Sequence, residues 1–206
     1  MKKELPFFYV GDSYGGNQDW CLDHIMQLGG CGAITALDSS IYFALRRNHK
    51  NLYDGDLKKL DKEHYIQQAE QMKPYLHPRW TGIDKLYLFT EGYGQYLADH
   101  HEHGIAMEEY DGDNDLHDAK EVVMRQIDAG MPIPCLILNH RNPEMEDYVW
   151  HWFLLIGYEA DDADPLGPDF KVETVTYSEG RWISFEDLWN TGYPVKGGLI
   201  LFHETK

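Results

Sequence analysis

The stretch that decides the fold is Leu28-Gly29-Gly30-Cys31-Gly32-Ala33-Ile34-Thr35-Ala36-Leu37. Apolar residues then recur three and four positions apart, at Ile34, Leu37, Ile41 and Leu45. This spacing places them on one face of a helix, so we expect a helix over residues 31–47 that begins at Cys31. A thiol at a helix N-terminus lies near the positive end of the helix dipole, which favours the nucleophilic thiolate.

The rest of the chain divides into helical patterns first and strand patterns afterwards. Helices are predicted over residues 62–72, 84–98 and 116–129, and a short one over residues 185–189, with Ser184 as its N-cap. Strands are predicted over residues 133–138, 148–158, 171–178 and 199–203. Residues 1–30 are expected to be irregular, and the acidic, histidine-rich residues 99–115 are expected to form a loop. This order predicts an α+β fold, with N-terminal helices packed on a C-terminal antiparallel sheet.

Length and composition indicate one folded domain that does not bind nucleic acid. The chain has 206 residues, of which 14 are Tyr, 8 Phe and 6 Trp, enough aromatic surface to build a sizeable core. Its formal net charge is −17, which opposes binding to nucleic acid or to an anionic membrane, because both require clustered Lys and Arg. A cationic partner or peptide is compatible with this charge.

The cysteine count and the N-terminus indicate a cytoplasmic protein. Cys21, Cys31 and Cys135 are an odd number, which does not fit a disulfide framework and suits a reducing compartment. The N-terminus has a basic start, but residues 11–13 interrupt the apolar stretch that a signal peptide requires. No apolar run approaches the length of a transmembrane helix.

A second set of residues supplies a candidate base. His151 begins an aromatic and aliphatic run that extends to Tyr158, and on a strand it shares a face with Phe153 and Leu155. An imidazole among such neighbours is partly desolvated and can accept a thiol proton. A cysteine at a helix start and a distant histidine on a strand together indicate nucleophilic acyl chemistry. Cys21 and Cys135 are alternative cysteines, but Cys21 begins no such helix, and Cys135 lies in an apolar strand typical of inert core thiols.

The order of these features resembles the papain-like cysteine peptidase superfamily. Cys31-Gly32 opens a helix early in the chain, and His151-Trp152 is followed by an apolar strand and by Gly157-Tyr158. A further strand then ends at Ser178-Glu179-Gly180, which resembles the Ser-x-Gly turn of the family. Within the superfamily the closest likeness is to the bacterial bacteriocin-leader peptidases and related acyltransferases. The resemblance implies a bacterial protein and a single papain-like domain spanning residues 1–206.

The resemblance also implies a glutamine that holds the oxyanion. Papain relatives carry it six residues before the nucleophile, where this chain has Ile25, so Gln18 and Gln27 are the available candidates. We favour Gln18, which lies in a glycine-rich loop followed by the aromatic anchor Trp20. The chain departs from the family at the third catalytic position, where Tyr177 stands in place of Asn or Asp.

The side chains beside this third catalytic position offer hydroxyl groups rather than a carboxylate or an amide. Thr176 and Ser178 flank Tyr177, and Glu173 lies about 13 Å back along the strand, too far for direct contact with His151. We therefore expect a Cys31–His151 dyad whose imidazole has no carboxylate or amide partner.

The resemblance implies a cysteine-dependent hydrolase, a peptidase or an amidase, or an acyl transferase that acts on a peptide or a small acyl substrate. Cys31, His151 and Gln18 are its predicted catalytic residues. The alternatives are a catalytically inactive papain-like module that binds a peptide or protein, and a purely structural accessory protein. The sequence leaves the oligomeric state open.

Metal binding is an alternative use of the acidic, histidine-rich segment. Its metal-ligating side chains are His100, His101, His103, Asp111, Asp113 and Asp115. The Asp-x-Asp-x-Asp pattern resembles the start of an EF-hand, but Leu116 and Val122 stand where that loop requires Gly and Glu. We therefore expect a solvated loop, with no metal and no cofactor.

Overall fold

Seven strands form one antiparallel sheet in the computed structural model, which describes residues 1–78 and 82–205. The strands of this sheet are β1 (Lys2–Glu4), β4 (Ile105–Asp111), β5 (Ile133–Ile137), β6 (His151–Glu159), β7 (Lys171–Thr176), β8 (Glu179–Ser184) and β9 (Gly198–Glu204). Their order is β4-β9-β5-β6-β7-β8, and β1 pairs with the second half of β6. A separate small hairpin joins β2 (Tyr9–Val10) to β3 (Ser13–Tyr14).

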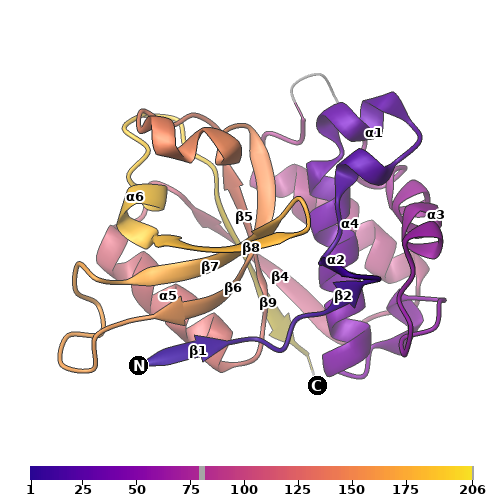
Figure 1. The fold of residues 1–206 in the computed structure, drawn as a ribbon, viewed down its shortest axis with the longest axis horizontal. Coiled ribbons are helices and arrows are strands. Elements are labelled where there is room, and N and C mark those ends of the chain that lie inside the picture. Colours follow the sequence, from indigo (N-terminus) through magenta and orange to yellow (C-terminus); the bar gives the residue numbers. More distant parts are fainter. Residues whose placement is uncertain (79–81, 206) are drawn as a thin grey trace.

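The N-terminal helices lie to one side of the sheet (Figure 1). The helices are η1 (Gln18–Trp20), α1 (His24–Gly29), α2 (Cys31–Arg46), η2 (Lys50–Leu52), α3 (Lys62–Met72), α4 (Leu86–Asp99), α5 (Leu116–Asp128), η3 (Pro143–Tyr148) and α6 (Phe185–Trp189). Helices α1 to α4 gather on one side of the molecule, and the sheet with α5 and α6 occupies the other (Figure 1). None of the helices in the described residues has both the length and the apolar composition needed to cross a bilayer.

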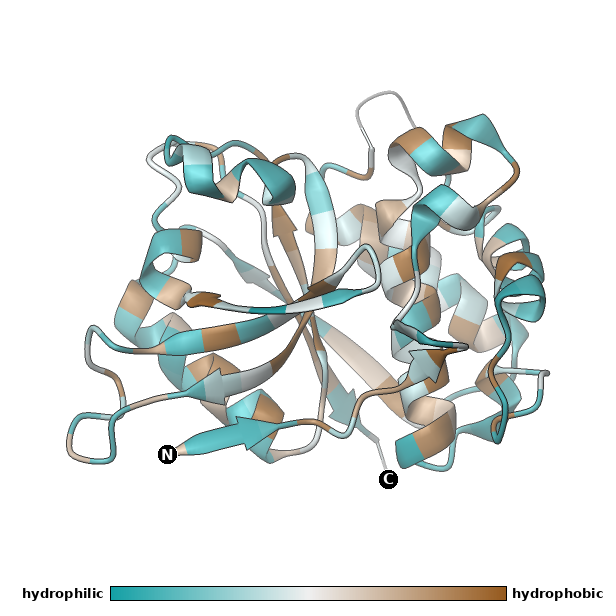
Figure 2. Cartoon of the chain, viewed as in Figure 1, coloured by the Kyte–Doolittle hydropathy of each residue, from teal (hydrophilic) through white to brown (hydrophobic). Residues whose placement is uncertain are grey.

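The core joins the two halves along α2 and β6. Most of α2 is buried, and residues 151–158 of β6 are buried without interruption. The strands at the centre of the sheet are mostly hydrophobic, and β1 at its margin is hydrophilic (Figure 2). Trp152 anchors this junction, because its ring stacks on Phe89 of α4 at 4.6 Å and its Nε1 donates to the Ile83 carbonyl at 2.6 Å. Trp152 thereby ties the start of β6 to α4 and to the segment that precedes α4.

The strongly periodic segments were predicted correctly. The helices predicted over 31–47, 62–72, 84–98 and 116–129 correspond to α2, α3, α4 and α5, and the predicted N-cap Ser184 accepts from the Asp187 N–H at 3.1 Å. The four predicted strands correspond to β5, β6, β7 and β9. The predicted combination of helices with an antiparallel sheet is therefore confirmed. It could be predicted because these elements carry clear hydrophobic patterns.

Three expectations were wrong. Residues 105–111, expected to be loop, form the edge strand β4, whose exposed Glu108 and Glu109 suit an edge because charges there oppose further pairing. Residues 1–30 are not irregular throughout, since they contain β1, the small hairpin and α1, whose N-cap Asp23 accepts from the Ile25 N–H at 2.8 Å. The turn predicted at Ser178-Glu179-Gly180 lies one residue earlier, at Tyr177 and Ser178, because residues 179 and 180 already belong to β8.

Candidate functional site

Cys31 is the first residue of α2, as the sequence predicts. Gly30 caps the helix, and its N–H donates to the Met26 carbonyl of α1 at 2.9 Å. A Cβ on Gly30 would lie 2.4 Å from that carbonyl oxygen, so a side chain at this position would force the two helices apart. Glycine is needed here for the sharp junction between α1 and α2, and this junction places the thiol at the helix N-terminus.

His151 is the first residue of β6 and pairs with Ile137 of β5. The preceding Trp150 has a φ of 52°, which is unusual for a non-glycine residue, and its N–H donates to the Leu138 carbonyl at 2.9 Å. The imidazole lies on the same side of the strand as Phe153, with the ring centroids 6.2 Å apart. The predicted placement of His151 beside Phe153 is thus confirmed.

Gln18 lies in the short helix η1 and reaches the same place. Its side chain is buried, and its Nε2 donates to the Gln27 carbonyl at 2.7 Å. Trp20, predicted to anchor this loop, packs edge-on against Tyr65 of α3 with ring centroids 5.5 Å apart. The amide nitrogen carries two hydrogens, and one of them is bound to Gln27. The second has no partner among the described residues, so it is free to bind a ligand.

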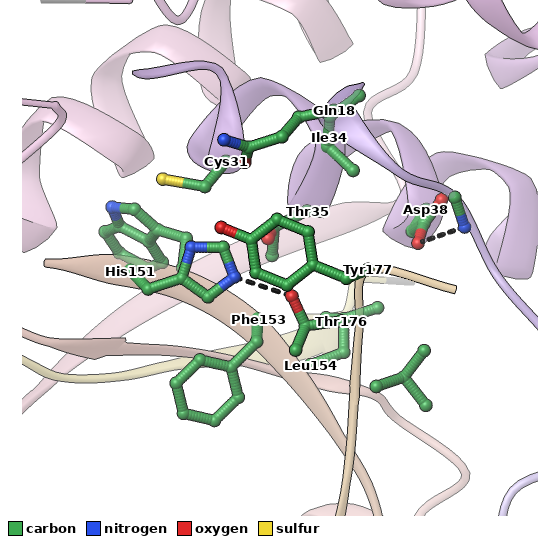
Figure 3. Close-up of a pocket in the computed structure, with 13 residues that line it drawn as sticks. Gln18, Cys31, Ile34, Thr35, Asp38, His151, Phe153, Leu154, Thr176 and Tyr177 are labelled. Atoms are coloured by element: carbon green, nitrogen blue, oxygen red, sulfur yellow. Dashed lines mark hydrogen bonds between the residues drawn. The ribbon is translucent and has the colours of Figure 1, made fainter. Parts of the chain in front are cut away.

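One pocket brings the three predicted residues together. Cys31, His151 and Gln18 all line it, although His151 is far from the other two in the sequence. The backbone N–H of Trp152, the residue after His151, favours the ionised form of the Cys31 thiol. Figure 3 shows the sulfur and the imidazole facing the same space, with the Gln18 amide nitrogen directed toward Cys31. The helix-start thiol and the strand histidine therefore meet at the junction of the two halves.

The dyad is neutral in this closed arrangement. Burial raises the pKa of the Cys31 thiol, although the backbone N–H groups of Trp152, Gly32 and Cys31 itself act in the opposite direction. Burial also lowers the pKa of His151 to about 4. The expectation that the helix N-terminus makes Cys31 a thiolate is wrong here, because the cost of desolvating a charge exceeds the stabilisation by the helix dipole.

Thr176 occupies the orienting position at which the family resemblance places Tyr177. The Thr176 Oγ1 lies 2.6 Å from Nε2 of His151, at the end of β7. In the tautomer that protonates Nε2, this bond leaves Nδ1 unprotonated, and Figure 3 places that nitrogen on the side of the ring toward Cys31. A neutral hydroxyl therefore fixes the imidazole, and no Asp, Glu or Asn among the described residues is hydrogen-bonded to it.

Tyr177 covers the site instead of orienting it. Tyr177 and Ser178 form the two-residue turn between β7 and β8, with φ values of 48° and 64°. Asn and Gly are the usual residues in such a turn, so Tyr and Ser hold a strained backbone. The Tyr177 ring stacks on the His151 ring with an interplanar angle of 4° and centroids 4.8 Å apart. Beneath this cover Cys31 is 5 % exposed, and the pocket encloses about 10 Å³, roughly one water molecule.

Removing this cover is expected to expose the thiol. The variant Tyr177→Ala should be alkylated by iodoacetamide at Cys31 about tenfold faster than the wild type, because access and solvation of the thiolate limit the reaction. Mass mapping of the modified peptide over a time course measures the rate. Tyr193→Ala removes another half-exposed tyrosine and serves as the control. Equal rates in the wild type and Tyr177→Ala would show that Tyr177 does not control access.

The competing candidates do not share this geometry. Cys21 and Cys135 are both buried, and burial raises the pKa of both thiols, that of Cys21 to about 11. Cys135 lies inside β5, opposite Phe153 of β6. Across residues 1–78 and 82–205, no group of three or more His, Cys, Asp or Glu side chains is arranged to hold a metal ion.

One polar residue of the pocket was not anticipated from the sequence. Asp38 lies seven residues after Cys31 on the same face of α2 and also lines the pocket. It is buried, its Oδ1 accepts from the Tyr65 hydroxyl at 2.7 Å, and its Oδ2 accepts from the Gly16 N–H at 3.1 Å. The only sequence signal for it is an acidic residue at a position of the helix that the pattern assigns to the core.

Comparison of the chain with protein-family models gives no match, and comparisons with curated proteins and with solved structures give none either.

Proposed function

We propose that this protein is a cysteine-dependent hydrolase, a peptidase or amidase, or an acyl transferase with a papain-like arrangement of its catalytic groups. The observation that carries the proposal is the single pocket shared by Cys31, His151 and Gln18. The nucleophile heads a helix in one half of the molecule and the base begins a strand in the other half. This division resembles that of papain-like peptidases, in which acyl chemistry takes place between the two halves.

The geometry supports a general-base mechanism that starts from a neutral pair. The Cys31 Sγ attacks the substrate carbonyl carbon while Nδ1 of His151 takes the thiol proton. The carbonyl oxygen becomes an oxyanion, which accepts from the Gln18 Nε2–H and the Cys31 backbone N–H. The intermediate collapses to a thioester as Nδ1 returns the proton to the leaving group. Water or an amine then attacks the thioester while Nδ1 of His151 takes its proton, and this proton passes to the Cys31 sulfur as the carbon–sulfur bond breaks.

A second candidate function is a catalytically inactive module that binds a peptide or protein. The observation that favours it is the closed pocket, in which Tyr177 stacks on His151 and space remains for about one water molecule. An enzyme with this structure must move the turn at residues 177–178 before a carbonyl can reach the sulfur. A binding module has no such requirement.

Turnover of two generic acyl donors separates the candidates. The probes are p-nitrophenyl acetate and S-acetyl-N-acetylcysteamine, each with and without hydroxylamine as an acceptor amine. An enzyme is expected to turn over at least one donor, and Cys31→Ala is expected to lose this activity. Cys21→Ala and Cys135→Ala remove the other two thiols and serve as matched controls that should retain it. Equal turnover by the wild type and Cys31→Ala would overturn the proposal in favour of the binding module.

A further inference from the structure

Asp38 is a buried carboxylate in the pocket that the proposed acyl chemistry does not use. It is 5 % exposed, and no Lys, Arg or His in the described part of the chain forms an ion pair with it. Burying a carboxylate without a cation is costly, and an apolar residue or an amide at this position of α2 would avoid the cost. The hydrogen bonds that Asp38 accepts therefore need a reason beyond packing.

These hydrogen bonds connect three elements, two of which also contribute residues to the pocket. Asp38 itself belongs to α2, Tyr65 reaches it from α3, and Gly16 reaches it from the loop that carries Gln18 two residues later. The Gly16 carbonyl in turn accepts from the Ser178 N–H at 3.1 Å and from the Ser178 hydroxyl at 3.4 Å. Gly16 thus links Asp38, through its N–H, to the turn formed by Tyr177 and Ser178, through its carbonyl.

The fit at Gly16 is too close for another residue. A Cβ there would lie 1.7 Å from the Tyr65 hydroxyl oxygen and 2.8 Å from Asp38 Oδ1. The loop backbone therefore packs directly against the carboxylate and its second donor. Such direct packing makes the position of the loop sensitive to the state of the Asp38 side chain.

We propose that Asp38 is a positioning residue, whose carboxylate holds Gly16 and thereby sets the Gln18 amide and the residue 177–178 turn for acyl transfer at Cys31. The inference rests on the proposed function. Asp38 acts through Gly16 and does not itself touch the substrate. An ionised carboxylate accepts a stronger hydrogen bond from Gly16 than a protonated one, so protonation of Asp38 loosens both the loop and the turn.

The proposal predicts a specific pH dependence. Burial raises the pKa of Asp38 to about 7, and the hydrogen bonds from Tyr65 and Gly16 act in the opposite direction. The other titratable groups that line this pocket are Cys31 on α2, His151 on β6 and Tyr177 on the turn, and no charged group contributes to the shift. Asp38 is therefore ionised above about pH 7 and protonated below it, so acylation of Cys31 should fall as the pH falls through 7.

Two probe reactions of Cys31 isolate this effect. Acylation by p-nitrophenyl acetate develops an oxyanion and needs the Gln18 loop, whereas alkylation by iodoacetamide develops none. In Asp38→Asn, acylation at about pH 8 should be about tenfold slower than in the wild type, and the two rates should converge at about pH 6. Alkylation should not be slowed. Ser39→Ala, which removes a buried hydroxyl bound only within α2, is the control and should keep the wild-type profile.

A second variant keeps the test decisive if Asp38→Asn folds poorly. Tyr65→Phe removes a hydrogen bond that lowers the pKa of Asp38, so the acid limb of acylation should move to higher pH. A purely structural role of Tyr65 would lower the rate at every pH without moving the limb. If Cys31 is acylated but neither variant changes the pH profile of the acylation rate, the positioning role of Asp38 is overturned and the proposed function stands. Absence of acylation in the wild type would overturn the proposed function together with it.

Discussion

His151→Ala is expected to slow acylation of Cys31 by p-nitrophenyl acetate about 10³-fold, the usual loss when a positioned base is removed. The reason is that the thiol is neutral, since burial raises the pKa of Cys31 above its ordinary value. A neutral thiol needs the imidazole to take its proton during attack, whereas a preformed thiolate would tolerate the loss far better. Stopped-flow absorbance of p-nitrophenolate measures the rate.

The control for this prediction is His117→Ala. It removes an exposed histidine on α5 that does not line the pocket. Its acylation rate should equal that of the wild type. A His151→Ala rate within about threefold of the wild type would mean that Cys31 reacts without this base. The pH profile of the acylation rate in Asp38→Asn adds a check. In this variant the remaining fall of the rate at acid pH should come from protonation of His151 and lie near its pKa of about 4. His151 is an unprotonated base above that pH and loses this role below it.

Gly16→Ala is expected to lower the free energy of unfolding by about 3 kcal/mol, at the upper end of the cost of forcing an extra methyl into a packed interior. The added Cβ would lie 2.1 Å from Cζ of Tyr65, which is a ring atom and cannot rotate away. Either the loop or α3 must shift, and both shifts break the hydrogen bonds to Asp38. Urea unfolding followed by tryptophan fluorescence measures the change.

Gly94→Ala provides the matched substitution for this measurement. Gly94 lies within α4, and a Cβ there would meet Met107 Cε at 3.7 Å, an ordinary contact. This variant should be more stable than the wild type by up to about 1 kcal/mol, because alanine is the better helix former. A Gly16→Ala protein as stable as Gly94→Ala would contradict the close packing of the loop against Tyr65 and Asp38.

The sequence predicts the elements whose hydrophobic pattern is long and regular. The start of helix α2 at Cys31 could be predicted, because the apolar spacing and the two preceding glycines both indicate it. The bounds of α3 also agree with the prediction, in which Pro74 ends the helix. Strand β4 was missed because its hydrogen bonds come from β9, which is distant in the chain, and because three of its seven residues are acidic. Helix α1 was missed because it has only six residues and ends at two consecutive glycines, which are typical of turns.

The candidate site divides in the same way. Cys31, His151 and Gln18 could be named from local patterns and from a resemblance, and the structure places all three in one pocket. Thr176 could not be distinguished from Tyr177, because the position of a two-residue hairpin turn decides which of them faces the imidazole. Asp38 was missed because its partners, Tyr65 and Gly16, come from distant segments. The apolar neighbours of His151 already indicate a desolvated imidazole, whereas the burial that keeps the Cys31 thiol neutral depends on the tertiary structure.

Peptide mapping of the wild-type protein after brief exposure to p-nitrophenyl acetate tests most directly whether the thiol of Cys31 and the imidazole of His151 act as one site. We predict an acetyl group on Cys31, little on Cys21 or Cys135, and loss of this label in His151→Ala. An acetyl group distributed over surface lysines, with Cys31 unmodified in both the wild type and Tyr177→Ala, would contradict the assignment.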